Sequence, residues 1–434
     1  MAQAVQAPDY LLDAQNIDYS LRSGDATKGM MSFASDGPPP LLRFKIGQSA
    51  IIDVANNLGE PTTVHWHGLR ISNEQDGVPY LTQWPIMTGE TARYSFAPPD
   101  AGTYWYHPHC NTLTQIGRGL TGVLIVDEGE DLGFDQDLAL NLRDFRLGDD
   151  NQFVTLFKPR QAARGGTLGT VMTANWQVEP LYDLPAGGLI RLRLVATDVT
   201  RLYRITLPGA ESRLIALDSQ PTPNNYQPRV IELGAGQRAD IALVMPREEG
   251  ALLHIQTETG NGPKPLAKLR AVGQSLGRDL NEVGPLPANP IAEPDLGNAE
   301  VIPFVFGWAP GDQPAVSVCG SLGYSFWSIN REVWPGDFPE PPGAIARLKL
   351  GKSYVFRLRN ETVYDHPIHL HGLTFRLLKS DKRDLPPLLT DTVVLGANET
   401  IDIAFRADNP GDWAFHCHVI EHQKTGLAAY IRIE

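Results

Sequence analysis

The sequence predicts an all-β protein of three tandem Greek-key β-sandwich domains, and three observations indicate this fold class. The chain has 434 residues, which is more than one hydrophobic core usually accommodates. Its 35 prolines and 41 glycines favour turns and short strands over long helices. Short runs of alternating apolar and polar residues recur, for example at residues 42–46, 190–194 and 355–359. We therefore expect half-buried strands throughout, with one short helix at residues 160–165.

The overall charge and hydropathy argue against several kinds of partner. The net charge of −13 disfavours a nucleic acid or an anionic membrane surface. No run of about eighteen apolar residues occurs, so we expect no membrane-spanning segment. Residues 1–7 contain neither a basic region nor a long apolar run, and they do not form a signal peptide.

The histidines are the most informative residues of the chain. Of eleven histidines, ten fall into four tight clusters, and scattered core or surface histidines would not gather in this way. Only His254 stands alone, and we interpret it as an ordinary histidine. The last cluster also contains a cysteine. The clustered residues are His65 and His67, His107 and His109, His366, His369 and His371, and His416, Cys417, His418 and His422.

An internal repeat connects these clusters. Residues 96–109 and 405–418 each place a phenylalanine eleven positions, and a glycine five positions, before their first histidine. A third copy lies at residues 250–257, where Ile255 and Thr257 occupy the two histidine positions. The repeat therefore predicts three copies of one fold, of which the middle copy has lost its metal ligands.

The repeat and the local composition together predict the domain boundaries. Charged residues and glycines at 128–135 mark the first boundary, and the proline-rich segment 284–290 marks the second. The predicted domains are residues 1–130, 131–283 and 284–434. The first domain contains four clustered histidines, and the third contains six together with a cysteine. Neither domain alone supplies a complete set of ligands. We expect the site where these two domains meet, with the middle domain as spacer and wall.

The stretch from His416 to His418 is expected to serve two sites. In an extended strand, neighbouring side chains point to opposite faces, so His416 and His418 point one way and Cys417 the other. Histidine with a cysteine thiolate is a nitrogen and sulfur donor set that suits copper. The other cysteines, Cys110 and Cys319, either form a disulfide or remain two buried thiols, and the sequence leaves both alternatives open.

Four stretches resemble the copper signatures of the multicopper oxidases, and within that family the chain is most similar to the three-domain laccases. The stretches are residues 65–68 (HWHG), 107–109 (HPH), 366–372 (HPIHLHG) and 416–422 (HCHVIEH). The similarity extends from about residue 35 to the C-terminus. It implies three cupredoxin-like domains that hold four copper ions per chain.

The resemblance also implies how the ligands are shared among the copper ions. It assigns a mononuclear blue, or type 1, copper to His366, Cys417 and His422. It assigns a type 2 copper to His65 and His369. The remaining ligands would hold a type 3 copper pair: His67, His107, His109, His371, His416 and His418.

Three further residues are expected to act beside the ligands. Where the family often has a methionine as the axial ligand of the blue copper, this chain has Leu427, which cannot ligate and should raise the reduction potential. Asp76 and Glu421 match acidic positions that relay protons in the family. The alternative for Asp76 is a turn residue before Gly77, and the alternative for Glu421 is a surface carboxylate. For Glu421 we favour the relay, because burying a carboxylate without a use is costly.

The resemblance implies a laccase-like reaction. Phenols and aromatic amines would each lose one electron at the type 1 copper, and O2 would be reduced to water at the trinuclear cluster. The chain has six methionines and no methionine-rich run that could gather Cu(I), which favours a small aromatic reductant. The alternative is an oxidase for Cu(I), Mn(II) or Fe(II) in copper tolerance. A copper-free structural protein and a copper-binding resistance protein are rivals from other classes.

The same resemblance gives expectations about partners and location. Besides O2 and the small aromatic reductant, we expect no nucleic acid and no membrane as a partner. We expect a monomer that works in the periplasm or outside the cell, although this chain contains no signal peptide.

Overall fold

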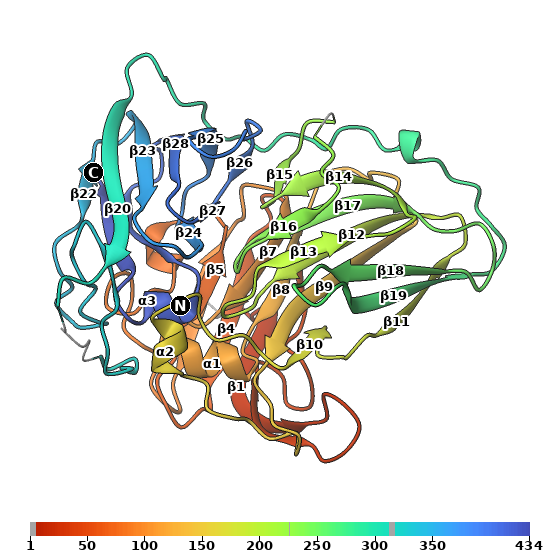
Figure 1. Cartoon of the computed structure of the whole chain (residues 1–434), viewed down its shortest axis with the longest axis horizontal. Helices are drawn as coiled ribbons and strands as arrows, with labels where there is room; N and C mark the ends of the chain where they lie inside the picture. Colours follow the sequence, from red (N-terminus) through yellow and green to blue (C-terminus); the bar gives the residue numbers. More distant parts are fainter. Residues whose placement is uncertain (1–5, 225, 312–316) are drawn as a thin grey trace, which may run out of the picture.

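The computed structural model describes residues 6–224, 226–311 and 317–434, and it confirms the predicted all-β fold. Six sheets form three successive β-sandwiches of the cupredoxin type, with two sheets in each (Figure 1). Residues 1–5 of the N-terminal stretch considered above lie outside the described residues. Within the described ranges, no helix is both long enough and apolar enough to cross a lipid bilayer.

The first sandwich consists of sheets with the strand orders β2-β1-β4-β6 and β3-β8-β7-β5. Its strands are β1 (Tyr10–Tyr19), β2 (Thr27–Ser32), β3 (Leu42–Lys45), β4 (Ala50–Asn56), β5 (His65–His67), β6 (Thr91–Phe96), β7 (Gly102–His107) and β8 (Gly122–Asp127). The middle sandwich has the orders β10-β9-β12-β17-β14-β15 and β11-β19-β18-β13-β16. Its strands are β9 (Gln136–Phe145), β10 (Val171–Ala174), β11 (Leu181–Pro185), β12 (Leu189–Ala196), β13 (Tyr203–Thr206), β14 (Glu211–Leu217), β15 (Gln220–Pro221), β16 (Ile231–Leu233), β17 (Arg238–Val244), β18 (Leu252–Thr257) and β19 (Lys264–Val272).

The third sandwich has the orders β21-β20-β23-β28-β25-β26 and β22-β30-β29-β24-β27. Its strands are β20 (Glu300–Trp308), β21 (Trp327–Ile329), β22 (Ala346–Leu348), β23 (Ser353–Asn360), β24 (His366–Leu370), β25 (Phe375–Ser380), β26 (Leu389–Thr390), β27 (Thr392–Leu395), β28 (Thr400–Arg406), β29 (Gly411–Cys417) and β30 (Ala428–Ile433). A long connection without strands, teal in Figure 1, runs from β19 to β20. The predicted boundaries after residues 130 and 283 fall between β8 and β9 and between β19 and β20, and they stay our proposal.

The same strand pairing recurs in the three sandwiches. In the first, β5 pairs with β7 and places His65 opposite His107. In the third, β24 pairs with β29 and places His369 opposite His416. In the middle sandwich, β13 pairs with β18 and places Ile205 opposite Thr257. The internal repeat of the sequence is therefore a repeat of structure, and its middle copy has apolar and hydroxyl side chains at the ligand positions.

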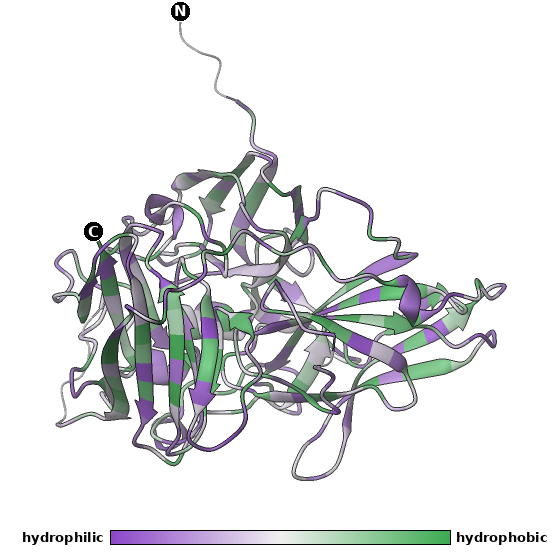
Figure 2. Cartoon of the chain, turned by 90° about the horizontal axis from the view of Figure 1, so that it is seen from above, coloured by the Kyte–Doolittle hydropathy of each residue, from purple (hydrophilic) through white to green (hydrophobic). Residues whose placement is uncertain are grey.

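Alternating residues give each sandwich an apolar interior. In β23, Phe356 and Leu358 are buried, whereas Arg357 and Arg359 point to solvent. Figure 2 shows this alternation as green and purple bands along the outer strands. Each sandwich has its own cluster of buried apolar side chains, as expected for three independent cores.

The prediction of a half-buried strand at residues 190–194 is wrong. All residues of β12 are buried, including Arg191 and Arg193. Their guanidinium groups face the first sandwich: Arg193 donates to Thr103 Oγ1 at 2.8 Å, and Arg191 donates at 2.8 Å to Glu128 Oε1, directly after the end of β8. A polar face that looks solvent-exposed in sequence is here covered by a neighbouring sandwich.

The described part of the chain has three short α-helices: α1 (Thr112–Arg118), α2 (Pro159–Ala162) and α3 (Ile420–Gln423). Two single turns of 3-10 helix, Asn73–Gln75 and Leu280–Glu282, lie elsewhere. The predicted helix at residues 160–165 overlaps α2, which begins with proline at its first position. Helices α1 and α3 were not predicted, because four to seven residues are too few to show a helical period. They pack together and lie close to α2 in Figure 1.

A disulfide joins the first sandwich to the third. Cys110 directly follows the ligand candidate His109, and it is bonded to Cys319 across 209 positions of sequence. The structure thus selects the paired alternative that the sequence left open. Cys417 is the free cysteine, and it is buried.

A buried arginine connects all three sandwiches. Arg238 of β17 donates to Asp391 of the third sandwich through two nitrogens, at 2.8 and 2.7 Å. It also donates to Asp218 Oδ1 at 3.1 Å and to the backbone carbonyl of Thr103 in the first sandwich at 2.9 Å. Arg238 is fully buried, so removal of the guanidinium would leave two buried carboxylates, Asp218 and Asp391, without their arginine partner.

We predict that Arg238→Met destabilises the copper-free protein by about 3–5 kcal/mol, the usual effect of breaking a buried ion pair. Urea unfolding followed by tryptophan fluorescence measures this change. Arg270→Met is the matched control, because Arg270 pairs with Asp183 on the surface and such pairs contribute little. Equal unfolding midpoints for the two variants would contradict a clamping role for Arg238.

Candidate metal centre

Eight histidines from the first and third sandwiches line one buried space. The rings are in close contact: His65 stacks on His371, and His67 stacks on His369, with centroids 3.8 Å apart in both pairs. Their ring nitrogens form three groups in which the atoms lie within 4.8 Å of one another. These groups are His65, His67 and His369, then His67, His107 and His418, and finally His109, His371 and His416.

Most of these imidazoles bind the protein with one nitrogen and turn the other toward the shared space. The Nδ1 atoms of His65, His107 and His369 lie 2.9 to 3.0 Å from the backbone carbonyls of Asp76, Pro108 and Asp391. Their Nε2 atoms are buried without a hydrogen-bond partner among the described residues. Contacts of this kind fix the ring and the tautomer of a metal ligand.

His67 has the opposite orientation. Its Nδ1 is the unpartnered nitrogen, whereas its Nε2 lies 3.4 Å from Asp391 Oδ1 and 3.4 Å from Thr392 Oγ1. The neighbouring Trp105 covers this part of the cluster, because its ring lies 4.9 Å from His67 and 4.2 Å from His107. His67 would therefore present Nδ1 to a metal, and His65 and His369 would present Nε2.

Burial keeps most of these imidazoles neutral. Loss of water around the ring lowers the pKa of His67, His107 and His418 well below the usual histidine value, and repulsion by neighbouring rings lowers it further. The pKa of His416 falls to about 3 for the same reasons. A neutral imidazole has a free lone pair, which is the form that binds a metal ion.

The cysteine forms a second, separate site with two histidines. Cys417 Sγ lies 3.6 Å from His422 Nδ1 and 3.7 Å from His366 Nδ1, and these two nitrogens are 3.1 Å apart. Burial raises the pKa of the Cys417 thiol, so a bound cation would be needed to hold it as a thiolate. The strand-based prediction is confirmed in its main point: His416 and His418 face the histidine cluster, and Cys417 faces the other way.

The segment is a strand only as far as Cys417. His418 lies just beyond the end of β29, and Glu421 and His422 belong to helix α3. His416 Nδ1 lies 3.0 Å from the carbonyl oxygen of Cys417, so a single residue connects the two sites. Leu427 is buried within the apolar cluster that contains Cys417, and its carbonyl accepts from the Cys417 amide.

Of the two predicted proton relays, Asp76 contacts cluster histidines directly. Asp76 Oδ2 lies 2.9 Å from His371 Nδ1, and Asp76 Oδ1 lies 3.1 Å from His65 Nδ1. Glu421 is also buried, so it is not a surface carboxylate. Its side-chain partners among the described residues are the amide and hydroxyl of Thr167 and the guanidinium of Arg146, both from the middle sandwich, and they include no cluster histidine.

Sequence reasoning missed several residues that contact the ligands. Asp391 and Thr392 contact His67 and His369, and Gln423 Nε2 lies 3.3 Å from His109 Nε2. Of these residues, only Gln423 could have been suspected from the sequence, because it directly follows the predicted ligand His422.

The backbone of Gly236 in the middle sandwich was also missed. It lies so close to the cluster that a Cβ there would be 3.0 Å from the His67 ring and 3.1 Å from the His418 ring. Gly236 also has a φ of 95°, which favours glycine. The middle sandwich therefore forms a wall of the centre.

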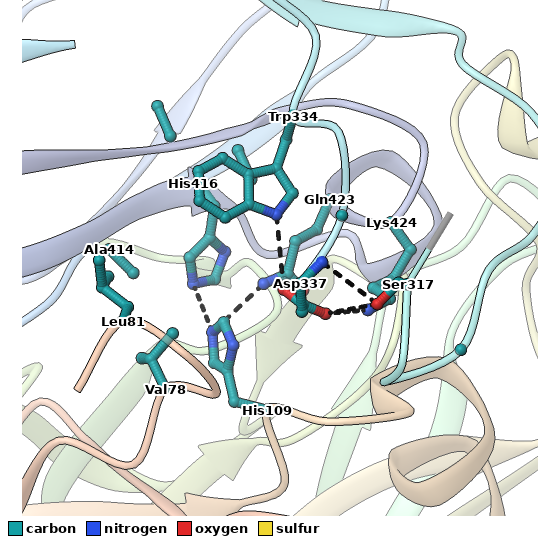
Figure 3. Close-up of a pocket in the computed structure, with 14 residues that line it drawn as sticks. Val78, Leu81, His109, Ser317, Trp334, Asp337, Ala414, His416, Gln423 and Lys424 are labelled. Carbon is teal, nitrogen blue, oxygen red and sulfur yellow. Dashed lines mark hydrogen bonds and ion pairs between the residues drawn. The ribbon is translucent and has the colours of Figure 1, made fainter. Parts of the chain in front are cut away.

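A small cavity opens beside the histidine cluster (Figure 3). Its volume is about 30 Å³, and His109 and His416 form part of its wall. On the opposite side, Lys424 Nζ lies 2.8 Å from Asp337 Oδ2, and Trp334 lies above this ion pair in the view. This volume suits one or two water molecules or a diatomic gas, and it is too small for an aromatic ring.

The residues present fit copper ions at both sites. The histidine cluster contains six buried ring nitrogens that have no hydrogen-bond partner among the described residues, which is unusual in a folded protein. Bound metal ions would satisfy these nitrogens. Imidazoles with one thiolate are the donor set of blue copper sites, and imidazoles alone suit copper as well.

We predict that the copper-free protein loses stability as the pH falls from 7 to 4. Unfolded histidines bind protons near pH 6.5, whereas the buried rings bind them only at lower pH, down to about 3 for His416 and His422. Protons therefore favour the unfolded chain over this interval. Urea midpoints at each pH measure the effect. His254→Gln should keep the same profile, and a flat profile between pH 7 and 5 would contradict the prediction.

Comparison with known proteins agrees with this geometry. Residues 14–131 and residues 316–434 match two sequence families that are both described as multicopper oxidase. The structure is similar to that of a multicopper oxidase from Pseudomonas thermotolerans, with 40% sequence identity and a TM-score of 0.88, over 99% of this chain and 100% of that chain.

Two curated proteins are related at lower identity. Multicopper oxidase MmcO of Mycobacterium tuberculosis is 28% identical over 92% of this chain and 82% of its own length. Laccase-1 of Botryotinia fuckeliana is 27% identical over 96% of this chain and 81% of its own length. The matched sequence families, the shared fold and the two sites of buried nitrogen and sulfur donors place this chain in the multicopper oxidase family, whose members are copper-dependent oxidoreductases that use O2.

Proposed function

We propose that this multicopper oxidase is a laccase-type enzyme that oxidises phenols and aromatic amines by single electrons and reduces O2 to water. The observation that supports this most directly is the position of Cys417. Its thiol faces His366 and His422, while the adjacent His416 and His418 face the histidine cluster. An electron accepted at the first site therefore has a covalent path of one residue to the second.

We further propose four copper ions per chain with the following ligands. A type 1 copper would bind His366, Cys417 and His422, with Leu427 at the axial position, and a type 2 copper would bind His65 and His369. A type 3 pair would bind the groups His67, His107 and His418, and His109, His371 and His416. Bound copper would supply the one-electron chemistry of both sites. The chain buries the ligands and excludes bulk water from them.

A cavity of about 400 Å³ is the proposed binding site for a small aromatic donor. It lies between the middle and third sandwiches, and Tyr364 and the carboxylates of Glu258 and Asp365 line it. Gly165 also lines it, and the preceding residue, Arg164, accepts a hydrogen bond from His422 Nε2 at 2.7 Å. Either carboxylate could accept the proton that a phenol releases when it loses an electron.

On the oxygen side, the 30 Å³ cavity beside His109 and His416 is the proposed path for O2. Asp76 is the proposed proton donor, because its carboxylate contacts His65 and His371 at the edge of the cluster. Glu421 stays a second proposed relay, held through Thr167 and Arg146. The separation of the two cavities allows the organic donor and O2 to bind on different sides.

Copper analysis combined with oxygen uptake tests the function. We expect four coppers per chain, an intense blue absorption, and oxygen uptake with 2,6-dimethoxyphenol. Cys417→Ser is the control, and it should lose the blue band while the histidine cluster keeps its copper. Oxygen uptake with Cu(I) but not with the phenol would favour the metal-ion oxidase instead.

We also propose that the enzyme is a monomer that works outside the cytoplasm. The disulfide between Cys110 and Cys319 supports the location, because such bonds persist in oxidising compartments. Cell fractionation and light scattering would test the location and the mass.

We predict that Leu427→Met lowers the reduction potential of the blue site. Methionine sulfur would give the copper a weak axial ligand that leucine cannot provide. Redox titration of the blue absorption measures the change, with Leu370→Met in the same core as the control. A potential that is unchanged or higher in Leu427→Met would contradict the axial assignment.

We predict that Asp76→Asn and Glu421→Gln each slow O2 reduction by about 10²-fold, the usual contribution of a positioned proton donor, while the blue band stays intact. Stopped-flow reoxidation of the fully reduced enzyme measures the step, after copper content has been checked. Asp183→Asn, which changes an exposed carboxylate, is the control. Unchanged reoxidation rates in both variants would exclude the relay.

A further inference from the structure

The ligands of the blue site are out of reach of any donor. His366, Cys417 and His422 are all fully buried. The outer nitrogen of His422 lies 2.7 Å from the backbone carbonyl of Arg164, and that of His366 lies 3.0 Å from Thr362 Oγ1. No ligand edge is therefore free to touch a substrate, and electrons must cross a residue that packs against the ligands.

One aromatic side chain packs against both imidazoles of this site. The buried ring of Trp327 lies 4.5 Å from the His422 ring and 5.1 Å from the His366 ring, measured between centroids. Its Nε1 donates to the carbonyl oxygen of Ala162 in helix α2 at 2.9 Å, which fixes the orientation of the indole. Trp327 therefore lies in a fixed position directly beside the ligands.

A second tryptophan extends this contact to the surface. Trp308 lies opposite Trp327 in the pairing of β20 with β21, and the two rings stack with centroids 4.4 Å apart and an angle of 19° between their planes. Trp308 is 47% exposed, whereas Trp327 is buried. Because electron tunnelling weakens steeply with distance, rings in contact couple well. Trp308, Trp327 and His422 form a continuous aromatic path from solvent to the blue site.

A stacked pair across two strands can also be explained as stabilisation of the sheet. Stabilisation of the sheet does not explain why the inner ring of the pair, Trp327, packs against His366 and His422 of the blue site. The other strongly exposed tryptophan, Trp84, is 71% exposed, and within the described residues its ring contacts only Tyr80. Trp84 has no ring contact with a ligand, so it serves as a natural control.

The surface around Trp308 suits aromatic partners. The amide of Ala309 donates to the carbonyl of Phe326, and the Phe326 ring stacks on Tyr324, which is 41% exposed. Tyr364 contacts both Trp308 and Trp327 edge-on at 6.2 Å. Aromatic rings of a large molecule could stack on this surface without entering the 400 Å³ cavity.

We propose that Trp308 is an electron-uptake point for phenolic polymers that are too large for the donor cavity. This rests on the proposed function, in which the blue site is the oxidant. Each phenol group on the polymer loses one electron and its hydroxyl proton and becomes a phenoxyl radical. The proton passes to water, and the electron would pass through Trp308 and Trp327 to the blue-site ligand His422. Four such oxidations, with four protons, reduce one O2 to two waters.

Comparison of a polymer with its monomer tests the path. The probes are soluble synthetic lignin made from coniferyl alcohol, and coniferyl alcohol itself. We expect Trp308→Leu to lower the ratio of polymer to monomer oxidation rate by about tenfold. Trp308→Tyr should restore part of the ratio, and Trp84→Leu should leave it unchanged. Copper content, blue absorption and the thermal midpoint are checked in each variant.

A binding measurement on the copper-free protein gives a readout independent of turnover. 2-Hydroxy-5-nitrobenzyl bromide alkylates exposed tryptophans and spares phenols, and peptide masses show which indoles have reacted. We expect synthetic lignin to protect Trp308 in the wild-type protein and to leave Trp84 reactive. Equal protection of both tryptophans, or an unchanged ratio of rates in Trp308→Leu, would overturn the proposal. Failure of the proposed function has a different signature, since wild-type enzyme would then oxidise neither the monomer nor the polymer.

Discussion

The structure depends on keeping a group of imidazoles neutral and buried between two sandwiches. Burying polar rings is unfavourable unless their hydrogen-bonding atoms find partners. Here the outer nitrogens of His65, His107 and His369 meet backbone carbonyls, so that only the inner nitrogens lack partners. This arrangement requires the strand pairs β5 and β7, and β24 and β29, to face each other closely. The disulfide between Cys110 and Cys319 joins the same two sandwiches next to the cluster.

The middle sandwich has lost its ligands, yet it contacts the centre at several points. Gly236 approaches the rings of His67 and His418 so closely that a Cβ there would lie only 3.0 to 3.1 Å from them. Arg238 holds Asp391, whose carboxylate lies beside His67. Burial alone would raise the pKa of the Asp391 carboxyl, but the charges and hydrogen bonds of Arg238 and His369 together outweigh burial and hold that pKa below its usual value. A carboxylate that stays ionised can orient the neighbouring imidazoles.

Sequence alone could predict the parts that depend on a local pattern. Histidines at fixed spacing, repeated in a common framework, predicted the cluster, and strand alternation placed Cys417 opposite to its neighbours. Asp391 and Arg238 could not be predicted, because they reach the cluster from separate sandwiches and no local pattern marks them. The burial of Arg193 was missed for a related reason: an alternating strand indicates a solvent face, but a neighbouring sandwich covers it here.

After Cys417 the alternation of side chains along a strand no longer applies, because the chain continues into helix α3. A strand has two faces, so it can serve two sites. A helix turns its side chains by about 100° per residue, so three consecutive residues of α3 can point to three environments. Glu421 points to Thr167 of the middle sandwich, His422 to the blue site, and Gln423 to His109 of the cluster. Residues 416–422 therefore contact both metal sites and the middle sandwich, because the chain changes from a strand to a helix within this segment. A strand continued beyond Cys417 would direct His422 and Gln423 only to the two faces of one sheet.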